Sequence, residues 1–286
     1  MFAEEIRVTI MRTIAAFGEG HVGGSLSIAD LLAVLYTRYI KTDTKNPRDP
    51  DRNKFVLSKG HCGPALYATL ALKGFFPMEE LKTLNRLGTR LPSHCDRNRT
   101  PGIDMSTGSL GQGASTAAGI ALADKIANRS SYTYLVLGDG ECNEGQVWEM
   151  AMFAAHQKLD HLIAFVDRNG QQLDGFTDDI CRMGDLTKIF HSFGWHSVAV
   201  NGHDIDALCK AIDEAKASAG APCMIILDTV KGKGWPYAES CMPSHYMTVS
   251  AEQLQDYEAV SKNRIALITE ELAHIQDKKG SQNDHQ

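Results

Sequence analysis

The chain has 286 residues, of which 43% are hydrophobic and 22% charged, and its formal net charge at pH 7 is −6. This length is enough to bury a sizeable core, and the composition is ordinary for a soluble globular protein. Lysine and arginine are spread along the chain without a basic stripe, which argues against nucleic acid or an anionic membrane as a partner.

The seven cysteines are scattered, and no two of them are spaced as Cys-x-x-Cys. This pattern argues against a zinc site and against a disulfide framework, and it fits a reducing compartment. The first residues include early acids and no long apolar core, so we expect no signal peptide, and no apolar run approaches a membrane span. The chain is therefore expected to be cytoplasmic.

Two helices are predicted before the first strand. Apolar residues at helical spacing over residues 3–17 place Ile6, Ile10, Ile14 and Phe17 on one face of a helix. The second helix is expected to begin at a Ser27 cap.

Strands and helices then alternate along the chain, which predicts an α/β fold, doubly wound around a mostly parallel sheet with helices on both faces. Residues 1–275 are expected to form a single domain that ends in an amphipathic helix or helix pair, and 276–286 a polar tail. The strands are predicted at 54–58, 134–137, 161–166, 197–200 and 223–227, and the helices between them at 65–73, 78–84, 114–126, 145–158, 186–193 and 204–218.

The stretch over residues 135–175 contains two of these strands joined by one helix, and a polar break follows each strand. The breaks are Gly-Asp-Gly at 138–140 and Asp-Arg-Asn-Gly at 167–170. Both lie at the carboxyl ends of their strands, which is the edge of an open parallel sheet where ligands bind.

Oxygen donors at the two breaks predict a site for a hard divalent ion. Asp139 offers a carboxylate, Asn169 an amide oxygen, and the loop after it backbone carbonyls. Mg²⁺ or Ca²⁺ takes oxygen ligands of these kinds and shares them with a diphosphate. Gly140 has no side chain, so that a bulky anion can approach the backbone closely. Gly-Asp-Gly alone fits a plain turn between strand and helix equally well.

The spacing of the breaks resembles the thiamine diphosphate motif, which starts with Gly-Asp-Gly and ends in asparagine about this far along. Glu-Gly at 144–145 and Leu-Asp-Gly at 173–175 narrow the resemblance to the transketolase family, and it spans roughly residues 5–250. The motif often ends in two asparagines, whereas Arg168 precedes Asn169 here. Transketolases commonly carry Asp-Asn, so only the second asparagine is needed. The resemblance implies a metal held by Asp139, Asn169 and the carbonyl of Gln171.

Four histidines lie in glycine-rich or irregular loops that the predicted topology brings to one edge of the sheet: His21, His61, His94 and His245. A lone histidine is most often structural or simply exposed. Four at one edge fit a polyhydroxylated, phosphorylated substrate, because imidazole donates and accepts hydrogen bonds near pH 7 and relays protons.

The resemblance implies a role for each histidine. His21 resembles the transketolase histidine near the substrate carbonyl, His61 the one beside the diphosphate, and His94 the family's substrate histidine. The family's Gly-His-Pro-Glu is Ser-His-Cys-Asp here, which implies a different loop shape. Lys231 and His245 resemble a cationic pair near the diphosphate, although the neighbours of His245 differ from the usual Trp-His-Gly.

Further cofactor contacts follow from the same resemblance. Gly108, Ser109 and Leu110 resemble the loop whose backbone holds the two rings of thiamine diphosphate, and Gly140 belongs to the diphosphate contacts. Glu144 resembles the buried acid of the family's proton link between paired active sites. It fits a helix-terminal charge stabilised by the macrodipole equally well.

The resemblance covers only the diphosphate-binding half of a transketolase. In the family, a glutamate of the pyrimidine-binding domain of the opposing subunit promotes loss of a proton from the cofactor, whose chemistry then drives the reaction. We therefore expect a separate C-terminal subunit, an α2β2 heterotetramer, and no turnover by this chain alone. The expected reaction moves a two-carbon ketol unit from a ketose phosphate to an aldose phosphate.

Two other functions remain open. One is the α subunit of a thiamine diphosphate-dependent 2-oxo acid dehydrogenase, against which the histidine set and the loop at 109–113 argue. The other is a non-catalytic cofactor-binding sensor on the same fold, which would have no need of proton relays. The sequence names neither the sugar nor the pathway, and it does not separate Mg²⁺ from Ca²⁺.

Overall fold

The computed structural model describes residues 1–242 and 244–283, with 275–283 described by their backbone alone. Its main sheet has five strands in the order β2-β3-β4-β6-β5, and every pairing within it is parallel. The predicted α/β fold is therefore confirmed, with strand ends shifted by one or two residues. The strands are β2 Lys54–Leu57, β3 Thr133–Gly138, β4 Leu162–Arg168, β5 His196–Asn201 and β6 Cys223–Asp228.

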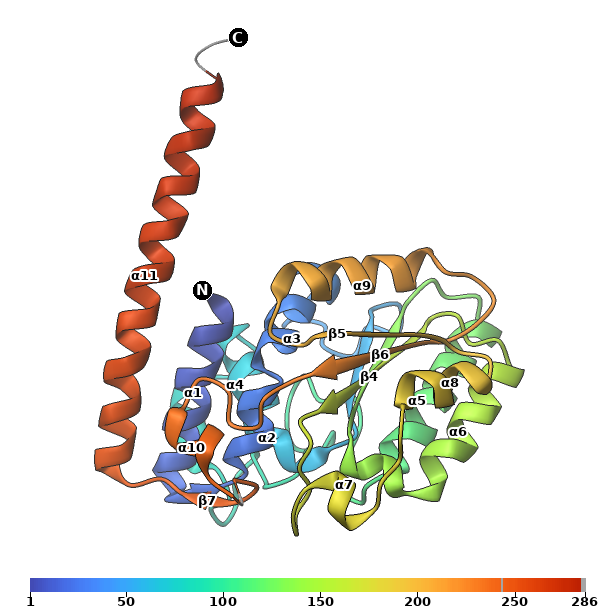
Figure 1. Ribbon diagram of the computed structural model, residues 1–286, viewed down its shortest axis with the longest axis horizontal. Helices are drawn as coiled ribbons and strands as arrows, with labels where there is room; N and C mark the ends of the chain where they lie inside the picture. Colours follow the sequence, from blue (N-terminus) through green and yellow to red (C-terminus); the bar gives the residue numbers. More distant parts are fainter. Residues whose placement is uncertain (243, 284–286) are drawn as a thin grey trace.

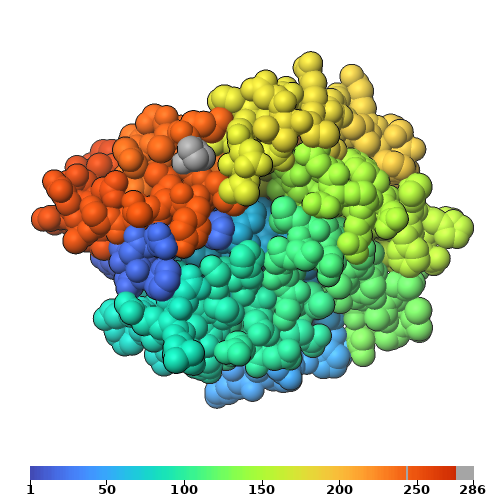
Figure 2. Space-filling model, turned by 90° about the horizontal axis from the view of Figure 1, so that it is seen from below, coloured from blue at the N-terminus to red at the C-terminus, as the bar shows by residue number. Residues whose placement is uncertain are grey.

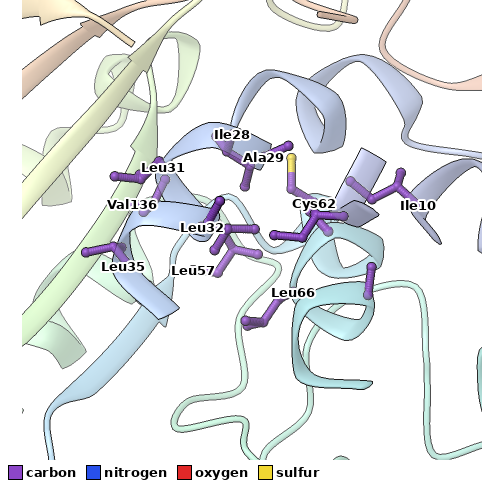
Figure 3. Close-up of a cluster of buried hydrophobic side chains, with 14 of the residues drawn as sticks. Ile10, Ile28, Ala29, Leu31, Leu32, Leu35, Leu57, Cys62, Leu66 and Val136 are labelled. Carbon is purple, nitrogen blue, oxygen red and sulfur yellow. The ribbon is translucent and has the colours of Figure 1, made fainter. Parts of the chain in front are cut away.

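Helices cover both faces of this sheet (Figure 1). Successive residues of a strand point to opposite faces, so Tyr134, Val136 and Phe165 belong to one core and Leu135 and Val166 to the other. The first core, part of which is drawn in Figure 3, is covered by α1 Phe2–Phe17, α3 Ala29–Val34, α4 Gly63–Leu72 and α9 Ile205–Ala217. The second is covered by α5 Gln112–Ile126, α6 Gly145–His156 and α8 Leu186–Ser192.

Short elements connect the main helices and strands. A two-stranded antiparallel ribbon of β1 Glu19–Gly20 and β7 Met247–Thr248 ties the amino-terminal region to the segment before the last helix. The other short elements are α2 Val22–Ser27, η1 Leu35–Tyr39, η2 Gly60–Cys62, η3 Met78–Thr83, η4 Gly140–Asn143, α7 Thr177–Ile180 and α10 Pro236–Ser240.

In the amino-terminal helices, one residue of the predicted apolar face is exposed and the predicted Ser27 cap is wrong. Phe17 is exposed, although Ile6, Ile10 and Ile14 are fully buried, because α1 ends there and Gly18 turns the chain at φ 106°. Ser27 is the last residue of α2 and caps no helix, since its hydroxyl donates to the carboxylate of Asp167 at 2.7 Å.

The carboxyl-terminal helix α11 is a single element, Ala251–Asn283, and it continues past residue 276. Its first part packs on α1, where Ser261 donates to Glu4 at 2.8 Å and Tyr257 is buried. Beyond Arg264 it projects from the body of the molecule (Figure 1), and Leu267 and Leu272 are 60% and 45% exposed. Among the described residues, no helix combines the length and apolar character of a membrane span.

Candidate active site

A cavity of about 520 Å³ lies at the carboxyl ends of β2, β3 and β4. In Figure 2 a hollow is visible where the segment before α11 (orange), the loop around α7 (yellow) and the green segment around residue 140 meet. All four predicted histidines line this cavity, together with the predicted cofactor and metal residues Gly108, Leu110, Asp139, Gly140, Glu144, Asn169, Gln171 and Lys231. Ser109 does not line it and is exposed.

The four histidines converge from four separate segments. His21 lies at the amino end of α2 and His61 in η2, whereas His94 and His245 lie in loops. The ring of His21 is 5.3 Å from His61, 5.8 Å from His94 and 5.2 Å from His245, measured between centroids. The four histidines, which the sequence places in loops at one edge of the sheet, thus lie side by side in the structure.

Burial keeps these imidazoles neutral. Burial and the neighbouring His94 and Lys231 lower the pKa of His21 to about 4, and burial and Lys231 lower the pKa of His245 to about 3. Burial and Lys59 hold the pKa of His61 well below its usual range. A neutral imidazole both donates and accepts a hydrogen bond, so the cluster suits the hydroxyl and carbonyl groups of a sugar.

Asp139 connects the two polar breaks. Its Oδ1 accepts from the backbone N–H of Gly140 at 2.9 Å, and its Oδ2 accepts from the N–H of Gly170 at 2.7 Å. Burial and the negative charge of Asp167 raise the pKa of Asp139 to about 6. Since the ionised form of Asp139 is disfavoured, a cation beside it would stabilise that form.

Asn169 and Gln171 supply the other oxygens. Asn169 Nδ2 donates to Asp167, and its Oδ1 accepts from the N–H of Gln171 at 3.1 Å. The backbone carbonyl of Gln171 accepts from Lys231 Nζ at 3.3 Å. The side-chain Oε1 of Gln171 is buried and has no hydrogen-bond partner among the described residues. The buried oxygen without a partner is one that a ligand would satisfy.

This donor set fits a hard divalent ion carrying a diphosphate. Among the side chains of residues 1–242 and 244–274, His, Cys, Asp and Glu form no group of three that could hold a metal, and the oxygens gathered here come from one carboxylate, one amide and one carbonyl. Carboxylate, amide and carbonyl oxygens are the ligands of Mg²⁺ and Ca²⁺. Lys231 adds positive charge, and burial and the charge of Lys59 lower its pKa to about 8.

Gly140 and Gly108 occupy crowded positions. A Cβ at Gly140 would lie 2.7 Å from the Gln172 side chain. Gln172 therefore occupies the space through which an anion was expected to approach the backbone of Gly140. A Cβ at Gly108 would lie 3.2 Å from His94. Both glycines therefore allow neighbouring side chains to approach the backbone.

Three charged groups at the cavity had no assigned role in the sequence analysis. Lys59 and Asp167 form an ion pair whose side chains are 2% and 0% exposed. Glu141 is also buried and accepts from the N–H groups of Gly138 and Gly111 at 3.0 and 2.8 Å. Glu144, predicted as the buried acid, is exposed in this chain. In the sequence, Glu141 and Lys59 could have been recognised only because Glu141 follows the Gly-Asp-Gly motif and Lys59 lies two residues before His61.

Comparison with known proteins points to one family. The family model for the "Transketolase, thiamine diphosphate binding domain" matches residues 1–279. The 6-deoxy-6-sulfo-D-fructose transketolase subunit SqwG of Clostridium sp. (strain MSTE9) is 52% identical over 250 residues, which cover 87% of this chain and 91% of that protein. An apulose-4-phosphate transketolase subunit of Phocaeicola vulgatus is 34% identical over 269 residues, which cover 94% of this chain and 95% of that protein.

Longer transketolases match along part of their length. Human transketolase is 38% identical over 233 residues, which are 81% of this chain and 37% of that protein. The solved transketolase from Leishmania mexicana has a TM-score of 0.87 at 32% identity, covering 91% of this chain and 41% of that one. With the cavity described above, these matches establish that the chain belongs to the transketolase family and forms its thiamine diphosphate-binding domain.

Proposed function

We propose that the chain is the thiamine diphosphate-binding subunit of a two-chain transketolase, which transfers a two-carbon ketol unit from a ketose to an aldose. The meeting of oxygen donors and neutral imidazoles in one cavity is the observation that carries the proposal. The matches also cover 91% and 95% of two relatives that are named as subunits.

Asp139, Asn169 and the carbonyl of Gln171 would hold Mg²⁺ or Ca²⁺ against the diphosphate. Lys231 Nζ donates to that carbonyl and lies 3.4 Å from His245 Nδ1. A carbonyl oxygen has two lone pairs, so it can accept this hydrogen bond and still face the ion. The ammonium group would then suit a phosphate oxygen. When bound, thiamine diphosphate supplies the carbon that attacks the ketose carbonyl.

The four histidines would bind and orient the sugar. Their lowered pKa values leave them neutral at pH 7, so each imidazole offers one donor and one acceptor to hydroxyl and carbonyl groups. The ring of His21 lies within 6 Å of the rings of His61, His94 and His245, so several imidazoles can hydrogen-bond one sugar at the same time.

A separate subunit carrying a pyrimidine-binding domain would complete the site, in an α2β2 heterotetramer of the cytoplasm. Apolar side chains at the cavity support a covering partner: Leu110, Leu173 and Ile180 line it and are still 37%, 61% and 49% exposed. Exposed apolar side chains grouped in this way are typical of a surface that another protein covers.

The names of the relatives indicate the substrate class. One relative is named for 6-deoxy-6-sulfo-D-fructose and the other for apulose 4-phosphate, both of which are ketoses with an anionic group. We propose a ketose with a terminal phosphate or sulfonate as the donor. The 52% identity to the first makes the sulfonated ketose the first substrate to test.

The test is reconstitution. The chain is purified with a second chain carrying the pyrimidine-binding domain and assayed for ketol transfer from 6-deoxy-6-sulfofructose and from fructose 6-phosphate, with thiamine diphosphate and Mg²⁺. We expect transfer by the pair and by neither chain alone, and calorimetry should show loss of cofactor binding in Asp139→Ala and Asn169→Ala. Absence of transfer from every ketose, or decarboxylation of a 2-oxo acid instead, would overturn the proposal.

A further inference from the structure

Asp167 is fully buried at the end of β4, and its carboxylate is the centre of a hydrogen-bonded group that we name the Asp167 cluster. Its Oδ2 accepts from Ser27 Oγ at 2.7 Å, from Asn169 Nδ2 at 2.9 Å and from Lys59 Nζ. Its Oδ1 accepts from Thr229 Oγ1. One carboxylate thus connects four segments of the chain.

Each of these segments carries a residue of the proposed site. Lys59 lies two residues before His61, and Thr229 lies two residues before Lys231. Ser27 ends the six-residue helix whose amino-terminal cap is His21. The fourth donor, Asn169, is itself a proposed metal ligand. A shift of the Asp167 carboxylate would therefore also move Asn169, His21, His61 and Lys231.

The carboxylate also selects one orientation of the Asn169 side chain. An ionised carboxylate only accepts hydrogen bonds, and an amide donates only through its nitrogen. Both oxygens of Asp167 act as acceptors here, Oδ2 for Ser27, Asn169 and Lys59 and Oδ1 for Thr229, and Lys59 is its counter-ion. Asn169 must then direct Nδ2 toward Asp167 and leave Oδ1 on the opposite side, near the N–H of Gln171.

We propose that Asp167, with Lys59 as its counter-ion, is a positioning residue that presents the Asn169 oxygen to the metal ion. The inference rests on the proposed function, since it assumes that Asn169 binds the metal of thiamine diphosphate. Partners that orient a metal ligand commonly raise metal affinity by about 10- to 100-fold. A fully buried ion pair contributes little net stability compared with apolar side chains of the same volume, so stability alone gives no reason for it here.

The test measures metal binding in the complex reconstituted with the partner subunit. Asp167→Asn replaces the acceptor by an amide that both donates and accepts, and Lys59→Met with Asp167→Asn does so without leaving the lysine charge unpaired. Mn²⁺, followed by electron paramagnetic resonance at fixed thiamine diphosphate, reports the dissociation constant, and circular dichroism reports the fold. Arg168→Met is the matched control, because Arg168 lies between the two residues and pairs with Asp228 outside the cluster.

We expect metal binding to weaken by about 10- to 100-fold in the double variant, and by no more than about twofold in Arg168→Met. Activity at saturating Mg²⁺ should return in the double variant, with KM for the ketose unchanged, which a loss of fold would not allow.

If the wild-type complex binds Mn²⁺ and the double variant binds it equally well, the inference fails and the proposed function stands. If the double variant does not fold, Asp167 is structural and the inference fails. If the wild-type complex binds neither metal nor cofactor, the proposed function fails as well.

Discussion

His21 and His245 are neutral at a pH at which the same side chains in an unfolded chain become protonated. Burial, His94 and Lys231 lower the pKa of His21 to about 4, and burial and Lys231 lower the pKa of His245 to about 3. An unfolded histidine titrates near pH 6.5. Below that pH the unfolded chain binds more protons than the folded chain, so the free energy of unfolding decreases from pH 6.5 toward pH 4.

Replacing His21 should reduce this pH dependence. We expect the slope of unfolding free energy against pH, between pH 6.5 and 5, to fall in His21→Gln by up to one proton, which is about 1.4 kcal/mol per pH unit. Urea unfolding in steps of pH measures the slope. His274→Gln, in the projecting part of α11, is the control and should leave it unchanged. Equal slopes in wild type and His21→Gln would contradict the account.

Cys181 is the exposed thiol at the cavity. It lines the cavity, whereas Cys62, Cys95, Cys142 and Cys223 are buried. We expect a maleimide to label Cys181 of the native chain faster than any of these four, as measured by mass spectrometry. In the reconstituted complex, saturating thiamine diphosphate and Mg²⁺ should slow that labelling by tenfold or more. Unchanged labelling would place the cofactor elsewhere.

The sequence identified those site residues whose neighbours along the chain form a recognisable motif. Asp139, Asn169 and the four histidines were predicted because glycines and spacing mark their loops, and the structure places them at one cavity. Glu141 and Lys59 were missed, because a charged residue next to a motif is usually solvated and only the tertiary structure shows that these two are buried. Their hydrogen-bond partners Ser58, Gly111 and Asp167 lie far from them in sequence or carry no pattern of their own.

Among the elements, α2 is packed so tightly against the segment before β7 that glycine is required. A Cβ at Gly23 would lie 2.4 Å from the backbone carbonyl of Ser244, which cannot move away as a flexible side chain would. We expect Gly23→Ala to destabilise the fold by about 1–3 kcal/mol in urea unfolding and to weaken cofactor binding, since α2 positions His21. Gly145→Ala is the control at the start of α6, where a Cβ meets nothing within 4 Å. A Gly23→Ala chain as stable as wild type would contradict this packing.

The helix α11 has a docked part and a projecting part. The docked part ends at Arg264, whose Nη2 donates to the carbonyl of Gly234 and lies 3.3 Å from Glu4. A chain ending at His274 should therefore keep its thermal midpoint within about 2 °C, because all of these contacts remain. A chain ending at Asp256 loses buried Tyr257 and should unfold at least about 5 °C lower. Differential scanning calorimetry of the two shortened chains measures their thermal midpoints. Similar midpoints would show that the docked part of α11 contributes nothing to stability.

The sequence predicted most elements but misjudged the ends of several. Alternating helices and apolar strands predicted the parallel sheet, since only a few topologies satisfy that order. The domain boundary at residue 275 stays a prediction. The helix α11 continues past it to Asn283, because polar residues continue an exposed helix as readily as they form a tail. Residues 284–286 of the predicted tail lie outside the described part of the chain.

For the whole molecule, binding of the cofactor and association with the partner should be linked. The cavity is hollowed into the surface (Figure 2), and apolar side chains such as Leu173 remain exposed at it. We expect thiamine diphosphate and Mg²⁺ to raise the thermal midpoint of the chain alone by less than about 2 °C, and that of the equimolar pair by several times more, because stabilisation by a ligand grows with the logarithm of its concentration divided by its dissociation constant. Scanning fluorimetry at several protein concentrations measures both. A shift of equal size without the partner would show that this chain binds the cofactor unaided.

The strand order β2-β3-β4-β6-β5 has a consequence for the chain as it leaves the ribosome. β5, residues 196–201, emerges before β6, residues 223–228, which is the described strand it pairs with, so β5 must wait without that neighbour. The cavity residues extend from His21 to His245, so nearly the whole polypeptide must be synthesised before the pocket can assemble. Nascent chains that stall before residue 223 would present an unpaired edge to chaperones and to one another.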